Sequence, residues 1–226
     1  MEKTSGVTAK LTLDRLMAFS DGVIAIAITI LVLGIDIPEG HRFSESGLIG
    51  FLGRIGHDVL IYAVSFVAVA TFWLQHHALF LYLRYCNRTL IWLNTLFLFS
   101  LTLIPFLAKL KFTYEHDPEI VRLFCAGPFF CGLMLLAMWR YVISHPELLG
   151  PETMDKALIR SMTLRMLLAP VVSVIAFCLS YLDIRLGTHA FFLIPLGALR
   201  HHRVDSEWEK EEESSTCPEP EMLPKP

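Results

Sequence analysis

The sequence predicts an all-α, polytopic membrane protein with six transmembrane helices, and three observations support this. Hydrophobic residues make up 54% of the 226 residues and charged residues only 18%, which is too few charges to cover a soluble domain. Twelve of the 41 charged residues fall within positions 200–226, so the preceding part is poorer still in charge. Six apolar stretches occupy that part. The composition excludes a disordered chain, a basic nucleic-acid binder and a typical cytosolic enzyme.

The six apolar stretches are separated by short connections that contain turn and helix-stop signals. A helix needs about 20 residues to cross the hydrocarbon core, and five stretches reach that length, whereas the sixth has only some 14. Pro105 and Pro170 lie inside stretches, where proline kinks or ends a helix. The stretches are residues 16–35, 59–83, 90–108, 120–143, 162–182 and 186–199.

The charge distribution divides the chain into three parts. Residues 1–15 form a short N-terminus, and residues 16–199 form the transmembrane domain. Residues 200–226 form an acidic tail with 4 basic and 8 acidic residues, which we expect to be disordered. No C-x-x-C pair occurs among the five cysteines, so no disulfide framework is implied.

Lysine and arginine predict the orientation. With six spans, the termini and two loops on their side, counted together with the adjoining helix ends, contain 13 Lys and Arg residues, against 6 on the opposite side. The positive-inside rule then places both termini in the cytoplasm. A cleavable signal peptide is the competing interpretation of the N-terminus, but the first apolar run is too long for its core. We therefore expect a multi-pass protein of the cell membrane.

The first apolar stretch contains an ionisable group. A charged side chain inside a membrane is costly, so Asp21 indicates a partner or a water-filled cavity. Arg15 and Asp21 are six residues apart, about 240° around a helix, and therefore do not pair with each other. Each is expected to bond to another helix or subunit, the alternative being that both mark the cytoplasmic membrane boundary.

Beyond Asp21, four residues share one face of the predicted helix. Gly22, Ile26, Thr29 and Leu33 are spaced i, i+4, i+7 and i+11, within about 60° of arc. If this face lined a pore, Ile26 and Leu33 would form two hydrophobic constrictions about 10 Å apart, with the Thr29 hydroxyl between them. Ordinary helix packing is the alternative explanation of the same spacing.

The second and third stretches supply polar groups. Trp73, His76 and His77 are neighbours on a helix, and Asn94 follows in the third stretch. Buried Trp, His and Asn bond across helices, so these side chains are candidate partners for Arg15 and Asp21. Adjacent histidines point about 100° apart, and no carboxylate or cysteine lies at ligand spacing, so we expect no metal and no cofactor.

A longer pattern contains these residues. The run Arg15-x-x-x-Phe19-Ser20-Asp21-Gly22-Val23-x-Ala25-Ile26-x-Ile28-Thr29-x-Leu31-Val32-Leu33 resembles the first-helix signature of the transmembrane protein 175 family, which comprises bacterial and endosomal–lysosomal potassium channels. The resemblance continues through Phe72-Trp73-x-x-His76-His77 and Trp92-Leu93-Asn94 to Ile104-Pro105-Phe106.

The resemblance implies a homotetramer in the lipid bilayer, with the first helix of each six-helix subunit lining a central pore for potassium ions. By position, Ile26 corresponds to the main constriction, and Thr29 and Leu33 line the next layers. The resemblance also implies that Arg15, Phe19, Ser20 and Asp21 help to hold the helices around the pore. The chain has no T-V-G-Y-G filter, which argues against ordinary potassium channels.

Two other functional classes compete with a potassium-permeable cation channel. A secondary transporter of an ion or small solute often shows inverted repeats around a midplane site, and no repeat is visible here. A membrane-embedded enzyme needs a nucleophile, a metal or an acid–base pair, and apart from Asp21 the predicted spans lack carboxylates. We therefore predict a channel and not an enzyme, with the transporter as the alternative.

Overall fold

The structure is a computed structural model, and it describes residues 3–35, 43–114, 117–150, 155–191 and 193–194. In these ranges the chain forms six α-helices and two short 3₁₀ helices, and it forms no β-strand. The elements are α1 (Lys3–Ile30), η1 (Leu31–Gly34), α2 (Phe43–Leu81), α3 (Arg88–Thr113), α4 (Pro118–Ile143), η2 (Pro146–Leu148), α5 (Lys156–Leu179) and α6 (Ile184–Ala190).

Five of these helices are long and apolar enough to cross a membrane, which confirms the predicted all-α, multi-pass fold. They coincide with the first five predicted stretches. The sixth stretch begins as the seven-residue α6, while residues 195–199 and the predicted acidic tail, residues 200–226, lie outside the described residues. The candidate spans are Leu13–Leu33, Asp58–Leu81, Arg88–Lys111, Pro118–Ile143 and Lys156–Leu179.

Local sequence signals explain where four helices begin. Asn87, Asp117, Asp155 and Asp183 each precede a helix, and each side chain accepts a hydrogen bond from a backbone N–H of the first turn. Such N-caps satisfy donors that the helix itself leaves free. The prolines expected to kink or end helices do not end them, because α3 and α5 continue through Pro105 and Pro170.

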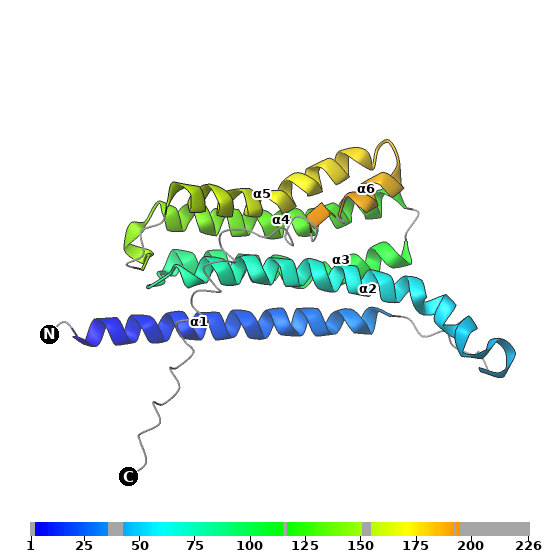
Figure 1. Cartoon of the computed structure of the whole chain (residues 1–226), viewed down its shortest axis with the longest axis horizontal. Coiled ribbons are helices and arrows are strands. Elements are labelled where there is room, and N and C mark those ends of the chain that lie inside the picture. The colour runs from blue at the N-terminus through cyan, green and yellow to red at the C-terminus, as the bar shows by residue number, and fades with distance from the viewer. Residues whose placement is uncertain (1–2, 36–42, 115–116, 151–154, 192, 195–226) are drawn as a thin grey trace, which may run out of the picture.

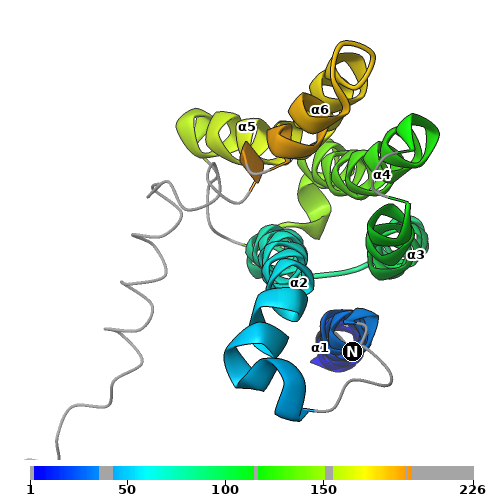
Figure 2. The ribbon, with the colours of Figure 1, turned by 90° about the vertical axis from the view of Figure 1, so that its right-hand side faces the viewer.

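The helices run roughly parallel to one long axis, and α1 extends past the others at its N-terminal end (Figure 1). An end-on view places α1 at one side of the bundle, next to α2 and α3, while α5 and α6 lie at the opposite side (Figure 2). Helix α4 packs against both α3 and α5. Helices α2 to α6 therefore form a packed bundle, and α1 lies along one side of it, against α2 and α3.

Glycines allow α4 to approach its neighbours closely. A Cβ atom added to Gly132 would lie 2.4 Å from Cδ of Pro170 on α5, and one added to Gly127 would lie 2.8 Å from Cδ1 of Leu107 on α3. Small residues at helix contacts permit this approach in membranes, where packing rather than the hydrophobic effect drives association. The α3–α4–α5 contacts are accordingly tight.

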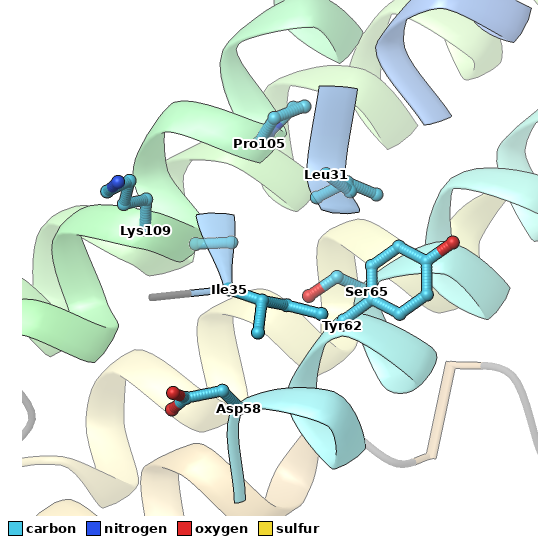
Figure 3. Close-up of a pocket in the computed structure, with 8 residues that line it drawn as sticks. Leu31, Ile35, Asp58, Tyr62, Ser65, Pro105 and Lys109 are labelled. Atoms are coloured by element: carbon cyan, nitrogen blue, oxygen red, sulfur yellow. The ribbon is translucent and has the colours of Figure 1, made fainter. Parts of the chain in front are cut away.

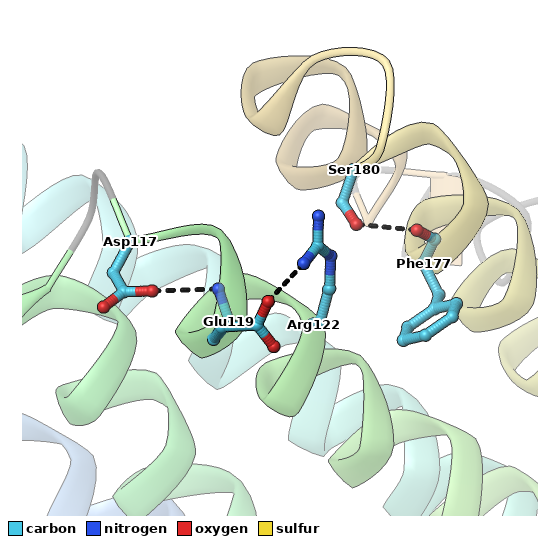
Figure 4. Close-up of polar contacts among 5 residues, drawn as sticks. All are labelled: Asp117, Glu119, Arg122, Phe177 and Ser180. Atoms are coloured by element: carbon cyan, nitrogen blue, oxygen red, sulfur yellow. Dashed lines mark hydrogen bonds and ion pairs between the residues drawn. The ribbon is translucent and has the colours of Figure 1, made fainter.

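Figure 4 shows hydrogen bonds at the start of α4 and at the end of α5, each formed within one of these two segments. Arg122 donates to the carboxylate of Glu119 one turn earlier, and its guanidinium carbon lies 3.9 Å from the ring centroid of Tyr181. A cation held over an aromatic face is attracted by the ring quadrupole. Arg122 thus connects α4 to the turn after α5.

At the other end of the bundle, the α2–α3 connection bonds to the α4–α5 connection. The backbone N–H groups of Arg84 and Tyr85 donate to the carbonyl of Leu148 at 2.8 and 3.3 Å, and that of Gly150 donates to Tyr82 at 3.0 Å. These bonds satisfy backbone groups that a loop would otherwise leave to water. They join α2 and α3 to α4 and α5 at the end where α1 begins.

Candidate pore-lining face and its inter-helix network

Helix α1 has one covered and one uncovered side. The covered side consists of Leu13, Ser20, Ile24 and Ala27, continued by Leu31 of η1, all buried against α2 and α3. The residues that share the predicted stripe lie on the opposite side, centred about 180° away at 100° per residue. We call this stripe the outer face of α1: Gly22, Ile26 and Thr29 on α1, with Leu33 on η1, the 3₁₀ helix that directly follows it.

Every residue of the outer face is exposed in the single subunit. Ile26 is 60% exposed and Leu33 is 74% exposed, and a Cβ added to Gly22 would meet no atom within 4 Å. Ordinary helix packing, the alternative explanation of the spacing, therefore does not account for Ile26 within the single subunit. A bulky apolar row left uncovered requires lipid, another subunit or a pore around it.

The Thr29 hydroxyl is oriented within α1. Its Oγ1 donates to the carbonyl of Ile26 at 3.0 Å. Because the hydroxyl hydrogen is engaged, the lone pairs of Oγ1 remain available to accept hydrogen bonds or to contact a cation. Thr29 therefore presents an oxygen, rather than a donor, on the outer face.

A buried chain of three polar side chains attaches α1 to α3 and α2. The amide nitrogen of Asn94 on α3 donates to Oγ of Ser20 on α1 at 2.9 Å. The amide oxygen of Asn94 lies 2.8 Å from Nε2 of His76 on α2. Ser20 and Asn94 are 0% exposed and His76 is 2% exposed, so these bonds form away from any solvent.

The directions of these bonds are determined by Ser20. Its hydroxyl donates to the carbonyl of Leu16 one turn earlier, at 2.8 Å, so Oγ can only accept from Asn94. The amide oxygen of Asn94 then faces His76, whose Nε2 carries the donated hydrogen. The rings of Phe80 and Phe97 stack on the His76 imidazole at centroid distances of 4.3 and 5.2 Å, which holds the ring in this orientation.

A second contact joins α1 to α2 at the edge of the outer face. The indole Nε1 of Trp73 donates to Oδ1 of Asp21 at 2.9 Å, and the Trp73 ring stacks on His77 at 5.5 Å. Asp21 is exposed beside this bond. The Asp21 carboxylate therefore has a partner within its own subunit.

The structure brings together six of the eight residues expected to form an inter-helix network. Trp73 is the partner of Asp21, as the sequence suggested, whereas Asn94 bonds to Ser20 and His76 rather than to Asp21 or Arg15. Arg15 and Phe19 are exposed instead, Phe19 by 57%.

The aromatic rings around His76 were not found from the sequence. One signal was available for Ser20: it falls on the arc of Leu13, Ile24 and Leu31, and a hydroxyl on a buried arc needs a bonding partner.

Two hollows flank α1. A groove of about 400 Å³ lies between α1 and α3, where Ile26, Ile30 and Leu33 face Pro105 and Phe106. A smaller pocket of about 30 Å³ lies among η1, α2 and α3, lined by side chains that include Asp58, Tyr62, Ser65 and Lys109 (Figure 3). The pocket has room for about one water molecule. Within the described part of the chain, no group of three His, Cys, Asp or Glu side chains is placed to hold a metal.

The fold and the site define a polytopic α-helical membrane protein whose first helix is attached by buried polar bonds and leaves one face uncovered. Residues 15–105 match the family model described as "Endosomal/lysosomal potassium channel TMEM175". This match confirms the resemblance that the first-helix signature indicated. The family is one of ion channels and not of enzymes.

Two relatives bear on the comparison. A potassium channel of Chamaesiphon minutus is 28% identical over 186 residues, which cover 80% of this chain and 91% of that protein. The mouse endosomal/lysosomal proton channel TMEM175 is 33% identical over 201 residues, covering 83% of this chain. The chain spans only 40% of the length of the mouse protein.

Solved structures show the same fold. The crystal structure of a lysosomal potassium-selective channel TMEM175 homolog from Chamaesiphon minutus superposes with a TM-score of 0.69 at 24% identity, covering 83% of this chain and 96% of that one. A variant of the potassium channel MtTMEM175, crystallised with a nanobody fusion protein, gives a TM-score of 0.58 at 21% identity, over 88% of this chain and 93% of that one. These likenesses concern the arrangement of the helices.

Proposed function

We propose that the chain is one subunit of a homotetrameric, potassium-permeable cation channel whose pore is lined by the outer face of α1. The observation that carries the proposal is the exposure of that face, which alternates bulky apolar residues with glycine and threonine on a helix whose opposite side is buried. A symmetric ring of such helices would cover the face and enclose a path along it. The name of the Chamaesiphon minutus relative, a potassium channel, agrees with this activity.

In the proposed pore, Ile26 forms the narrowest ring. Four converging apolar side chains leave an opening too dry for a hydrated ion, so the closed state is held by dewetting. The Thr29 oxygens lie about one turn further along α1, about 4.5 Å away at 1.5 Å per residue. They replace part of the water that a potassium ion loses as it passes Ile26, and Leu33 forms the next apolar layer.

We further propose that the inter-helix network holds α1 in register against α2 and α3. Hydrogen bonds are directional, so the Ser20–Asn94–His76 chain fixes the rotation of α1 about its axis more sharply than apolar contact does. Asp21 and Trp73 form a second attachment near the same level. Phe19, which is 57% exposed in the single subunit, is available to the surrounding subunits, and Arg15 is exposed on the same side of α1 as the outer face.

The placement of the channel follows from its spans and charges. We propose that residues 16–199 form the transmembrane domain of a multi-pass protein in the cell membrane, with residues 1–15 and 200–226 in the cytoplasm. The excess of Lys and Arg on the side of the termini supports this orientation. An impermeant thiol reagent that modifies a cysteine at position 15 from the cytoplasmic side only would support it, and modification from the opposite side only would contradict it.

The test uses a matched pair of isoleucines on opposite sides of α1. Ile26 lies on the outer face, whereas Ile24 is 1% exposed on the covered side. Ile26→Asn should wet the constriction, raise the basal single-channel current in a planar bilayer, and weaken the preference for potassium over sodium. Ile24→Asn should instead lower the yield of folded protein, because it buries a side-chain amide among apolar groups that offer it no hydrogen bond.

Three outcomes would contradict the proposal. A folded Ile26→Asn tetramer with unchanged conductance and selectivity would remove Ile26 from the pore. Transport without discrete unitary currents would indicate a secondary transporter instead. A reversal potential that follows a pH gradient and ignores a potassium gradient would show a proton channel, the activity named for the mouse relative.

A further inference from the structure

Arg15 occupies the same side of α1 as the proposed pore lining. Helix α1 is continuous from Lys3 to Ile30, so the helical register extends without interruption from Arg15 to Thr29. Arg15 precedes Gly22 by seven residues and Ile26 by eleven, which places it in the same arc of about 60° at 100° per residue. Its side chain is exposed, whereas Leu13 and Ser20 on the opposite side are buried.

Neither nearby carboxylate on α1 shares this direction. Asp21 lies about 120° from Arg15 by the shorter way around the helix. It accepts a hydrogen bond from Trp73. Asp14 is exposed on the adjacent flank, about 100° away. In a ring of α1 helices, the guanidinium groups of Arg15 therefore point more directly toward the axis than either carboxylate does.

We propose that Arg15 forms a cationic ring at the cytoplasmic mouth of the pore and that this ring limits the outward flow of cations. The inference rests on the proposed function, because it requires α1 to surround a conducting axis. At 1.5 Å per residue, the ring lies about 16 Å from Ile26. It is therefore at the entrance rather than in the constriction, where it acts on the supply of ions and not on their selection.

The expected size of the effect follows from simple electrostatics. Four unit charges placed about one Debye length from the axis, roughly 10 Å at 0.1 M salt, change the local concentration of a monovalent cation by roughly two- to threefold. Ions that enter from the cytoplasm experience this depletion and ions that enter from the other side do not. The outward unitary current is consequently smaller than the inward one, and the asymmetry disappears at about 1 M salt, where the Debye length is roughly 3 Å.

The test changes the charge after assembly. In excised patches of Arg15→Cys channels in about 0.1 M KCl, a negatively charged methanethiosulfonate reagent on the cytoplasmic side should raise the outward unitary current roughly four- to ninefold over a positively charged one, because the comparison spans four added negative and four added positive charges. The reversal potential should not move. The same reagents on the unsubstituted chain control for its native cysteines. Arg160→Cys, at an exposed position on α5, should give no difference between the two reagents.

Each other result overturns the inference. Equal currents after both reagents would show that the ring is absent or neutralised by a neighbouring carboxylate, and modification only from the opposite side would place Arg15 elsewhere. If Arg15→Cys does not assemble, the salt dependence of the unsubstituted channel tests the inference. A difference between outward and inward unitary currents that persists from about 0.1 M to about 1 M KCl would show that the ring of charge is not its cause. Absence of any unitary current from the unsubstituted protein would instead contradict the proposed function.

Discussion

Helices α1 and α4 are both apolar and both long enough to span a membrane, yet they are held in different ways. Helix α4 packs on both α3 and α5 through fully buried side chains such as Leu135, Met138 and Trp139. Helix α1 is covered on one side only (Figure 2). A buried hydrogen bond to α3 and an exposed one to α2 supplement its apolar contacts. Helix α4 is therefore built as a scaffold, whereas α1 is built to keep a face free.

The glycines of the two helices show the same difference. Gly132 on α4 is in direct contact with Pro170 and Ala169, and any added atom would collide with them. Gly22 on α1 has open space where its side chain would be. One glycine permits close packing, and the other leaves room on an uncovered face. Substitutions at three sets of positions test this contrast.

The largest effect is expected for a matched pair of tryptophans. Trp139 on α4 is 0% exposed and its Nε1 donates to Oγ1 of Thr163 on α5 at 2.9 Å, whereas Trp92 on α3 is 59% exposed. Trp139→Ala should lower the free energy of unfolding by about 3–5 kcal/mol, and Trp92→Ala should leave the subunit folded. Thermal unfolding in detergent measures both, and equal losses would contradict the division into scaffold and exposed faces.

A pair of glycine substitutions should have a smaller effect. Gly132→Ala inserts a methyl group against Pro170 and should cost about 1–3 kcal/mol by overpacking. Gly22→Ala adds a methyl group in open space and improves helix propensity, so the folded subunit should be at least as stable as before. Comparison of the two melting temperatures tests this, and a Gly22→Ala protein that melts lower than Gly132→Ala would show that α1 is the more tightly packed helix.

The smallest effect on the subunit is expected at the edge of the outer face. Asp21→Ala removes the acceptor of the Trp73 indole, and single interhelical hydrogen bonds in a bilayer average about 0.6 kcal/mol. Assembly is the more sensitive measurement, because we expect the loss of this attachment to lower the recovery of tetramers in size-exclusion chromatography. If the variant were fully tetrameric and stable but lost its ion selectivity, Asp21 would belong to the permeation path.

The spacing of residues predicted which face of α1 is uncovered but not the partners of its polar groups. Gly22, Ile26, Thr29 and Leu33 follow from the helical period alone, and the structure shows that they are exposed together. Whether these residues face a pore or lipid depends on how subunits assemble, and the residue pattern of one chain does not specify contacts between subunits.

The partners depended on how distant helices pack. The bond between Ser20 and Asn94 joins residues 74 positions apart. Choosing Asn94 for Ser20 rather than for Asp21 required the rotation of α3 against α1, which no local signal in the sequence specifies. The Trp73–Asp21 contact could be predicted from the sequence, because strong hydrogen-bonding groups in apolar stretches have few other polar groups to bond to.

The hydrogen bond from Ser20 to Leu16 also bears on the order in which the protein enters the membrane. Helix α1 is synthesised before α3, so Ser20 reaches the bilayer before Asn94 exists. Because its hydrogen is donated one turn back along the same helix, the hydroxyl carries no unmet donor while α1 waits in lipid. Asn94 then arrives as a donor to an oxygen that is already oriented, and docking of α3 requires no bond on α1 to be broken.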